Sequence, residues 1–133
     1  MIDKENEVYT RVRERVLESY PNASVDGTYQ PVPSGFPHIS IYQSDAFTPR
    51  EFLDSGTYAK LEAVLFEVQV YSNKTSTKKQ ECKKIMSIID DVMQEMNMRR
   101  SSLVPVPNLN DASIYRLTAR YEGVVDAGGF YRR

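Results

Sequence analysis

The sequence is poor in the residues that catalytic and metal sites most often use. Its 133 residues include one cysteine, one histidine and no tryptophan. Cys82 and His38 provide only two of the four nitrogen or sulfur ligands that a structural zinc site needs. A single cysteine also excludes an internal disulfide and suits a reducing compartment. No nucleophile motif surrounds Cys82, so we expect no catalytic residue, no metal and no cofactor.

Long apolar runs and glycine-rich loops are also missing. No apolar run approaches the ~20 residues that cross a bilayer, and the acidic, polar first seven residues do not resemble a signal peptide. We therefore expect synthesis in the cytoplasm and no membrane partner. Gly128 and Gly129 precede no helix, which argues against a phosphate-binding loop. The net charge of −1 provides no overall attraction for nucleic acid. The length predicts a single domain, residues 1–133.

The clearest pattern runs from Leu61 to Met98. Residues 61–71 alternate as in a strand that is buried on one side, and the apolar face consists of Val64, Phe66, Val68 and Val70. Hydroxyl side chains at 75–77 offer an N-cap for a helix. Apolar residues then recur at three- and four-residue spacing: Cys82, Ile85, Met86, Ile88, Ile89, Val92, Met93 and Met96. This spacing predicts an amphipathic helix that packs across the strand before it.

The remaining segments complete an α+β pattern. Residues 3–19 predict a first helix, with Val8, Val12 and Val16 on one face. Residues 38–42 and 112–125 alternate as strands, and 130–133 are a candidate terminal strand. The extended pieces 24–30 and 102–107 lie near or contain prolines, which places them at sheet edges. We therefore predict an α+β domain with a mostly antiparallel β-sheet and two helices packed on one face.

Residues 43–60 show no period and predict a long irregular loop. The segment contains the aromatic residues Phe47, Phe52 and Tyr58. Such a segment inside a compact domain is usually functional or mobile. Two interpretations stay open: a surface loop whose phenylalanines pack back onto the core, or a loop that becomes ordered against a partner.

Charged residues form two groups. Lys74, Lys78, Lys79, Lys83 and Lys84 cluster at the start of the predicted long helix, where a solvated helix face is the simplest interpretation. Arg116, Thr118, Arg120 and Glu122 share one face of the last long strand. Mixed charges in a row suit pairing across strands or across a subunit contact. Arg99 and Arg100 follow the predicted helix, where cations suit its C-terminus.

The second half of the chain resembles a known family. The motifs are Val70-Tyr71-Ser72-Asn73, the Thr/Lys-rich helix start 75–79, Cys82-Lys83-Lys84-Ile85-Met86, Pro105-Val106-Pro107-Asn108, residues 114–126 and the closing Tyr131-Arg132-Arg133. Together they resemble the small tail terminator, or tail completion, proteins of long-tailed bacteriophages of Gram-positive hosts. The similarity covers residues 61–133, and the first half matches mainly in order and length.

The resemblance implies a non-enzymatic role in the virion. Members of the family assemble as a ring, commonly a hexamer, on the last ring of the tail tube. The ring stops tube growth and offers the docking surface for the filled head, and DNA later passes through its lumen. The implied partners are therefore further copies of the chain, the tail tube protein and the head–tail connector or stopper protein.

A ring also sets physical requirements that are independent of any family. It needs a head-to-tail interface that closes on itself. We expect Phe47, Phe52 and Tyr58 to anchor subunit or partner contacts, and an edge strand, with 102–107 as one option, to join a neighbour's sheet. We expect Arg116 and Arg120 to pair with carboxylates across subunits, since bare arginines in a channel would hold the phosphates of DNA. Glu122, on the same face, belongs to this candidate interface.

Two other functions fit the sequence less well. Another neck protein, such as a head-completion or stopper protein, is the nearest alternative. A small nucleic-acid-binding regulator that uses the lysine-rich helix start is the third hypothesis, against which the near-neutral charge argues.

Overall fold

The fold is an open sheet with two helices packed against it. The computed structural model describes residues 5–28, 33, 35–47, 62–106, 113–126 and 129–130. In chain order the elements are α1 (Glu5–Ser19), β1 (Ser24–Asp26), β2 (His38–Phe47), β3 (Glu62–Ser72), α2 (Lys78–Glu95), β4 (Arg99–Pro105), β5 (Tyr115–Asp126) and β6 (Gly129–Phe130). The strand order is β1-β2-β3-β5-β4, with β6 on β5. Only β1 and β2 pair in parallel, so the predicted α+β, mostly antiparallel fold is confirmed.

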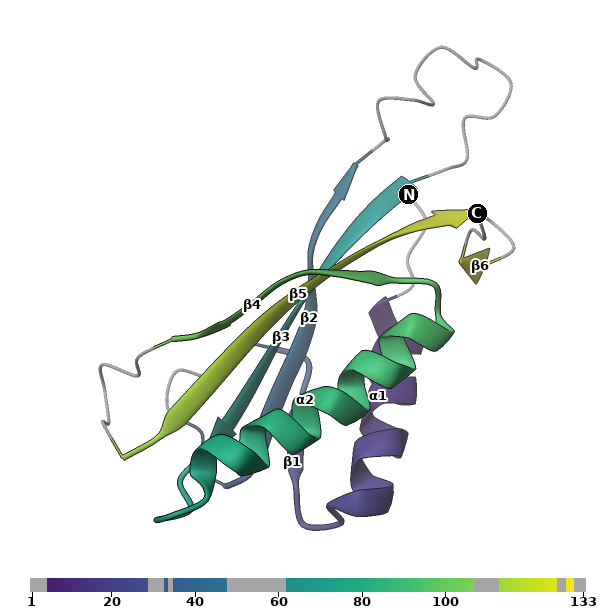
Figure 1. Ribbon diagram of the computed structural model, residues 1–133. Helices are drawn as coiled ribbons and strands as arrows, with labels where there is room; N and C mark the ends of the chain where they lie inside the picture. Colours follow the sequence, from purple (N-terminus) through teal and green to yellow (C-terminus); the bar gives the residue numbers. More distant parts are fainter. Residues whose placement is uncertain are drawn as a thin grey trace.

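Both helices lie on one face of the sheet (Figure 1). The predicted apolar faces form one core: Val8, Val12 and Val16 of α1 are buried with Ile85, Ile89 and Met93 of α2. The even positions of β3, from Val64 to Val70, form the floor of this core and are fully buried. Burial of this apolar surface is the main term that stabilises the fold. In the part of the chain that the structure describes, no helix has the length and apolar character needed to span a bilayer.

The two ends of α2 are held in different ways. At the start, Thr77 is the N-cap but makes no side-chain capping bond. Instead, the Glu81 carboxylate, in the first turn, accepts a hydrogen bond from Ser72 at 2.7 Å and lies 3.1 Å from Lys74 Nζ. At the end, Asn97 has φ of 60° and Met98 N–H donates to Met93 O, which is a Schellman motif.

The chain changes direction at the end of α2. Arg99 and Arg100 follow the left-handed Asn97 and begin β4, so neither lies in the last turn of the helix. Arg100 Nη1 lies 3.6 Å from Asp90 Oδ1, and the Tyr121 hydroxyl donates to the same oxygen at 3.1 Å. Asp90 thus connects α2 to β4 and β5.

The prediction of an irregular loop at 43–60 is wrong for its first residues. Residues 43–47 continue β2, which runs to Phe47. The register with β3 shifts between Gln43 and Asp45, so Ser44 is an extra residue in a bulge. A bulge breaks the period-2 pattern, which explains why the sequence showed no alternation there. The rest of the predicted loop, residues 48–60, lies outside the described residues.

Candidate interaction surface

The sheet face opposite to the helices carries a band of polar and aromatic side chains, which we call the helix-free face. Strand alternation and cross-strand register place these residues together. Its central residues are His38, Ser40, Tyr42, Glu67, Gln69, Tyr71, Arg116, Thr118, Arg120 and Glu122. The structure thus brings the predicted interface residues Arg116, Arg120 and Glu122 onto one face, as the alternation of β5 predicted.

Hydrogen bonds join four of these side chains into a chain across β2 and β3. The Tyr71 hydroxyl donates to Gln69 Oε1 at 3.1 Å, and Gln69 Nε2 donates to the Tyr42 hydroxyl at 3.1 Å. Tyr42 in turn donates to Glu67 Oε2 at 2.6 Å. Burial, followed by the hydrogen bond to Glu67, raises the pKa of Tyr42 to about 12, so the hydroxyl stays protonated. A satisfied network of this kind makes a rigid, largely buried polar layer on this side of the sheet.

Two arginines beside this network face carboxylates within the chain. Arg120 Nε lies 3.6 Å from Glu67 Oε1 on the directly opposed residue of β3. Arg99 Nη2 of β4 donates to Glu122 Oε1 at 3.0 Å. Both arginine side chains are more than half exposed, so each ion pair adds little stability, but each neutralises local charge.

Arg116 has an aromatic neighbour. Its guanidinium carbon lies 5.8 Å from the centroid of the Tyr71 ring, which is a cation–π contact. We expected Arg116 and Arg120 to pair with carboxylates of a neighbouring subunit. The contacts within one chain do not test this, and it stays a prediction.

The aromatic anchors are placed only in part. Phe47 is the last residue of β2, at the far end of the β2–β3 pair. Phe52 and Tyr58 lie outside the described residues, so the predicted role of these three residues stays a prediction.

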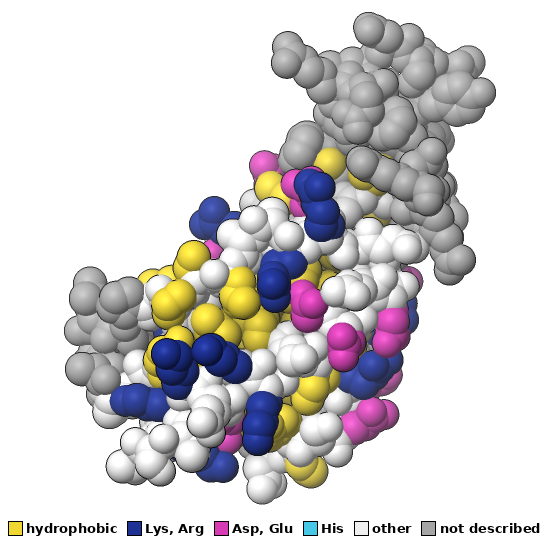
Figure 2. Space-filling model, viewed as in Figure 1, with side chains coloured by type: hydrophobic (Ala, Val, Ile, Leu, Met, Phe, Trp, Pro, Cys, Tyr) yellow, Lys and Arg dark blue, Asp and Glu magenta, His cyan; other side chains and the backbone are white. Residues whose placement is uncertain are grey.

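The predicted edge strand at 102–107 is confirmed in part as β4, Arg99–Pro105, the last strand of the sheet order. It carries exposed apolar side chains: Leu103 is 38% exposed and Val104 is 48% exposed. Figure 2 shows hydrophobic side chains gathered beside α2 along the line of β4, with Lys and Arg around them. An edge strand with apolar side chains is a typical site for strand pairing between chains.

Two lysines of the cluster at the start of α2 make contacts within the chain. Lys74 pairs with the buried Glu81 carboxylate, and Lys78 Nζ donates to Ser113 O at 3.1 Å. These two lysines fix the start of α2 against the sheet and the segment before β5. This lessens the positive charge available to a nucleic acid.

His38 connects β1 to β2. Its Nδ1 lies 3.1 Å from Ser24 Oγ and its Nε2 lies 3.1 Å from Ser40 Oγ. The side chain is buried, and burial lowers the pKa of His38 below its usual value, although Asp26 acts in the opposite direction. The neutral imidazole is therefore a structural link between two strands.

Cys82 is buried on the side of α2 that faces the sheet, as its spacing predicted. Its thiol donates weakly to the carbonyls of Val70 at 3.5 Å and Tyr115 at 3.6 Å. Burial raises the pKa of Cys82 to about 12, which suppresses the thiolate. Across the described ranges, no three His, Cys, Asp or Glu side chains gather as metal ligands would.

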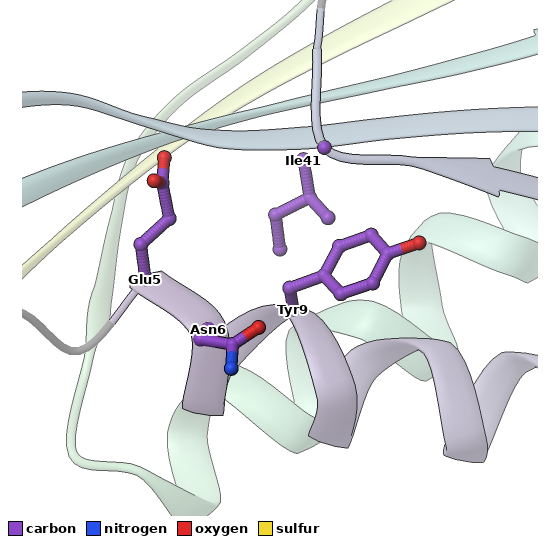
Figure 3. A pocket seen from close by; sticks show the side chains of 5 residues that line it. Glu5, Asn6, Tyr9 and Ile41 are labelled. Carbon is purple, nitrogen blue, oxygen red and sulfur yellow. The ribbon is translucent and has the colours of Figure 1, made fainter.

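One hollow of about 290 Å³ lies between the start of α1 and the sheet (Figure 3). Its lining consists of Glu5, Asn6, Tyr9, Gly27 and Ile41. In Figure 3 the Glu5 side chain reaches from α1 toward β2, and the Tyr9 ring lies below Ile41. The Glu5 carboxylate accepts the Gln43 backbone N–H at 2.6 Å. Sequence reasoning missed this hollow, because its residues come from α1, β2 and the segment after β1 and share no motif.

The sequence was compared with protein families and with curated proteins. No protein-family model matches the sequence, and no curated protein matches it significantly.

Proposed function

We propose that this chain is a phage structural protein, a tail terminator that forms a ring on the end of the tail tube. The single observation that carries the proposal is the open β4 edge, with Leu103 and Val104 exposed at the side of a sheet that the helices cover on one face only. Such a sheet can continue into the sheet of a second copy, and head-to-tail repetition closes into a ring. The family resemblance of residues 61–133 supports the same function.

The exposed residues of the helix-free face, Arg120 and Glu122 among them, are the proposed lining of the lumen. His38, Ser40, Gln69, Tyr71 and Thr118 on the same face are buried and lie beneath that lining. Continuation of the sheet around a ring puts one face inside and the other outside, and the helices fill the outer side. The arginines Arg120 and Arg99 of the helix-free side already face Glu67 and Glu122. Paired arginines hold phosphates less strongly than bare ones, so DNA can slide past them.

The proposal includes three further elements that follow from the resemblance. The ring is commonly a hexamer, it docks on the tail tube protein, and it receives the head–tail connector or stopper protein. Its place is therefore the junction of tail and neck in the virion. Another neck protein, such as a head-completion or stopper protein, would use the same kind of open edge and remains the alternative.

Negative-stain electron microscopy separates these functions. The purified chain is imaged alone, with tail tubes and with DNA-filled heads. Rings that cap tube ends and stop tube elongation support the terminator. Rings on the head portal support the alternative neck protein, and a chain that binds neither structure contradicts both.

A further inference from the structure

The outer side of β4, which we call the β4 edge, has exposed apolar side chains on both faces of the sheet. β4 is the last strand in the sheet order, so no described strand lies on its outer side. Leu103 lies opposite the core residue Ala119 and is therefore on the helix side, whereas Val104 is on the helix-free side. An edge of this kind can accept a further strand that packs against both side chains.

The backbone groups of Leu103 point out of this edge. The Val106 N–H donates to Arg116 O on β5 at 3.0 Å, and the register with β5 is continuous over 102–105. Because bonded and non-bonded positions alternate along an antiparallel pair, Leu103 and Pro105 turn their backbone groups away from β5. The edge thus offers the N–H and C=O of Leu103 and the C=O of Pro105. Since proline has no N–H, a strand that joins here leaves no donor of Pro105 without an acceptor.

One row of side chains on α2 lies above the β4 edge. Asp90 Oδ1 lies 3.6 Å from Arg100 Nη1 of β4, which shows that this side of the helix faces the edge. Met86, Lys83 and Lys79 precede Asp90 at four-, three- and four-residue spacing, so they lie on the same side of α2. Both lysines are exposed. Lys and Arg side chains border the apolar strip that Figure 2 shows beside α2.

The two lysines differ from the arginines of β4. Arg99 and Arg100 already face carboxylates of their own chain, so their charges are balanced. In the part of the chain that the structure describes, neither Lys79 nor Lys83 has a hydrogen bond or an ion pair. The row therefore keeps positive charge beside an apolar edge, and a strand with carboxylates on its helix side would complement both features.

We propose that the β4 edge accepts an antiparallel, extended acidic segment of a partner, with an apolar side chain beside Leu103 and carboxylates toward Lys79 and Lys83. Directly opposed residues share a face of the sheet, so the partner residue across from Leu103 lies on the helix side. The next positions on that side are two residues away, and there carboxylates meet the lysine row. The positions between them lie beside Val104 and take β-branched side chains.

This inference rests on the proposed function, because it names the chemistry of the strand that joins the sheet at the ring contact. Electrostatic complementarity favours an acidic strand over a basic one at this edge. Two β4 edges that met would bring their lysine rows together, so the same charges disfavour pairing of β4 with itself. The edge thus selects a different, acidic segment, as a head-to-tail contact requires.

A designed peptide tests the strand contact. The fluorescein-labelled peptide TEVLVET reads the same in both directions and, as a strand, puts glutamate, leucine and glutamate on one face. Its binding to the full chain is measured by fluorescence anisotropy. One control, TKVLVKT, reverses the charge, and the other carries a methyl group on the leucine nitrogen, which then cannot donate to the Leu103 carbonyl. We expect both controls to bind at least about tenfold more weakly.

A matched pair of variants tests the lysine row. Lys83→Glu reverses a charge beside the edge, whereas Lys84→Glu makes the same change about 100° further around α2, outside the row. Both side chains are exposed, so the fold tolerates either change. We expect Lys83→Glu to weaken binding of TEVLVET about tenfold and to strengthen binding of TKVLVKT. Lys84→Glu should change either affinity less than about threefold, because its charge is more distant and more screened.

Amide hydrogen exchange locates the bound peptide. In the free chain the Leu103 N–H points away from β5, so it should exchange faster than the Val104 N–H, which bonds to β5. Addition of TEVLVET should slow exchange at Leu103 and leave Val104 as protected as before. If the chain has already assembled, the peptide should slow or reverse assembly, since both use the same edge.

The outcomes separate this inference from the proposed function. Equal binding of TEVLVET and its controls, equal effects of the two lysine variants, unchanged exchange at Leu103, or rings that are insensitive to the peptide overturn the acidic strand on β4. Rings that still cap tail tubes in these cases leave the proposed function standing. A chain that binds TEVLVET as described but never caps a tube overturns the proposed function and leaves the strand contact standing.

Discussion

The Tyr42 hydroxyl donates a hydrogen bond to Glu67 Oε2 at 2.6 Å, directly across the β2–β3 ladder. Glu67 also faces Arg120 on the other side, so one carboxylate connects three strands on the helix-free face. Gln69 donates to the same tyrosine oxygen. Tyr42 is therefore the central member of the network.

Replacement of Tyr42 by phenylalanine should lower the free energy of unfolding by about 1–3 kcal/mol. It removes the charge-assisted hydrogen bond to Glu67 and the hydrogen bond from the side-chain amide of Gln69. Urea denaturation measures the effect. Tyr9→Phe is the matched control: its hydroxyl is part-buried but donates only to the Val25 carbonyl, at 3.1 Å, so the expected loss is about 1 kcal/mol. Equal losses in the two variants would show that the network adds nothing beyond a single hydrogen bond.

The free energy of unfolding should decrease as the pH is lowered, because of His38. Its pKa is lower in the folded chain than in the unfolded chain, so the unfolded state binds more protons between the two values. The contribution of His38 is fully present above the unfolded pKa, near 6.5, and is lost as the pH falls toward the folded pKa. Denaturant midpoints between pH 5 and 8 measure this.

The control for the pH dependence is His38→Gln, which can still bond to Ser24 and Ser40 but does not titrate. Its midpoint should vary less over the same window, whatever its absolute stability. An unchanged pH slope in this variant would assign the dependence to other groups.

The thiol of Cys82 should react with a disulfide reagent only after the chain opens. With a pKa raised from 9.0 to about 12, the folded chain holds on the order of 10³ less thiolate near neutral pH. The rate of colour release with an aromatic disulfide reagent should therefore rise sharply in denaturant. Rapid reaction of the native chain, at the rate of a free thiol, would contradict the buried position.

The sequence predicted the elements with strong periodicity and missed those that depend on tertiary contacts. The faces of β3 and β5 followed from alternation, since each buries one side against α2. The extension of β2 was missed because the bulge at Ser44 breaks the alternation. The start of β4 at Arg99 was missed because it depends on the left-handed turn at Asn97, which no periodicity indicates.

The candidate site shows the same division. The row of Arg116, Arg120 and Glu122 could be placed on one face from the strand period alone. The Glu5 cap on Gln43 could not, because it joins residues that are 38 positions apart. Hollows and long-range side-chain contacts of this kind arise only when the sheet is assembled, so no local pattern encodes them, whereas the prolines of 102–107 did indicate an edge strand.

A last prediction concerns the contact of Gly123 with Met98. Gly123 lies in β5 opposite Val64, and a Cβ atom on it would approach Met98 Cγ to 2.8 Å. Met98 is buried and its backbone is fixed by the Schellman motif, so it cannot easily withdraw. Gly123→Ala should therefore destabilise the chain by about 1–3 kcal/mol through overpacking.

A double-mutant cycle isolates this contact. Met98→Ala alone leaves a cavity and is expected to cost about 2–5 kcal/mol. In Gly123→Ala/Met98→Ala the added methyl group meets no Cγ, so the loss should be smaller than the sum of the two single losses by at least about 0.5 kcal/mol. Thermal or urea unfolding of the four chains gives the coupling. Strict additivity would mean that the backbone of β5 moves away instead, and that the close approach of Gly123 to the end of α2 does not set their spacing.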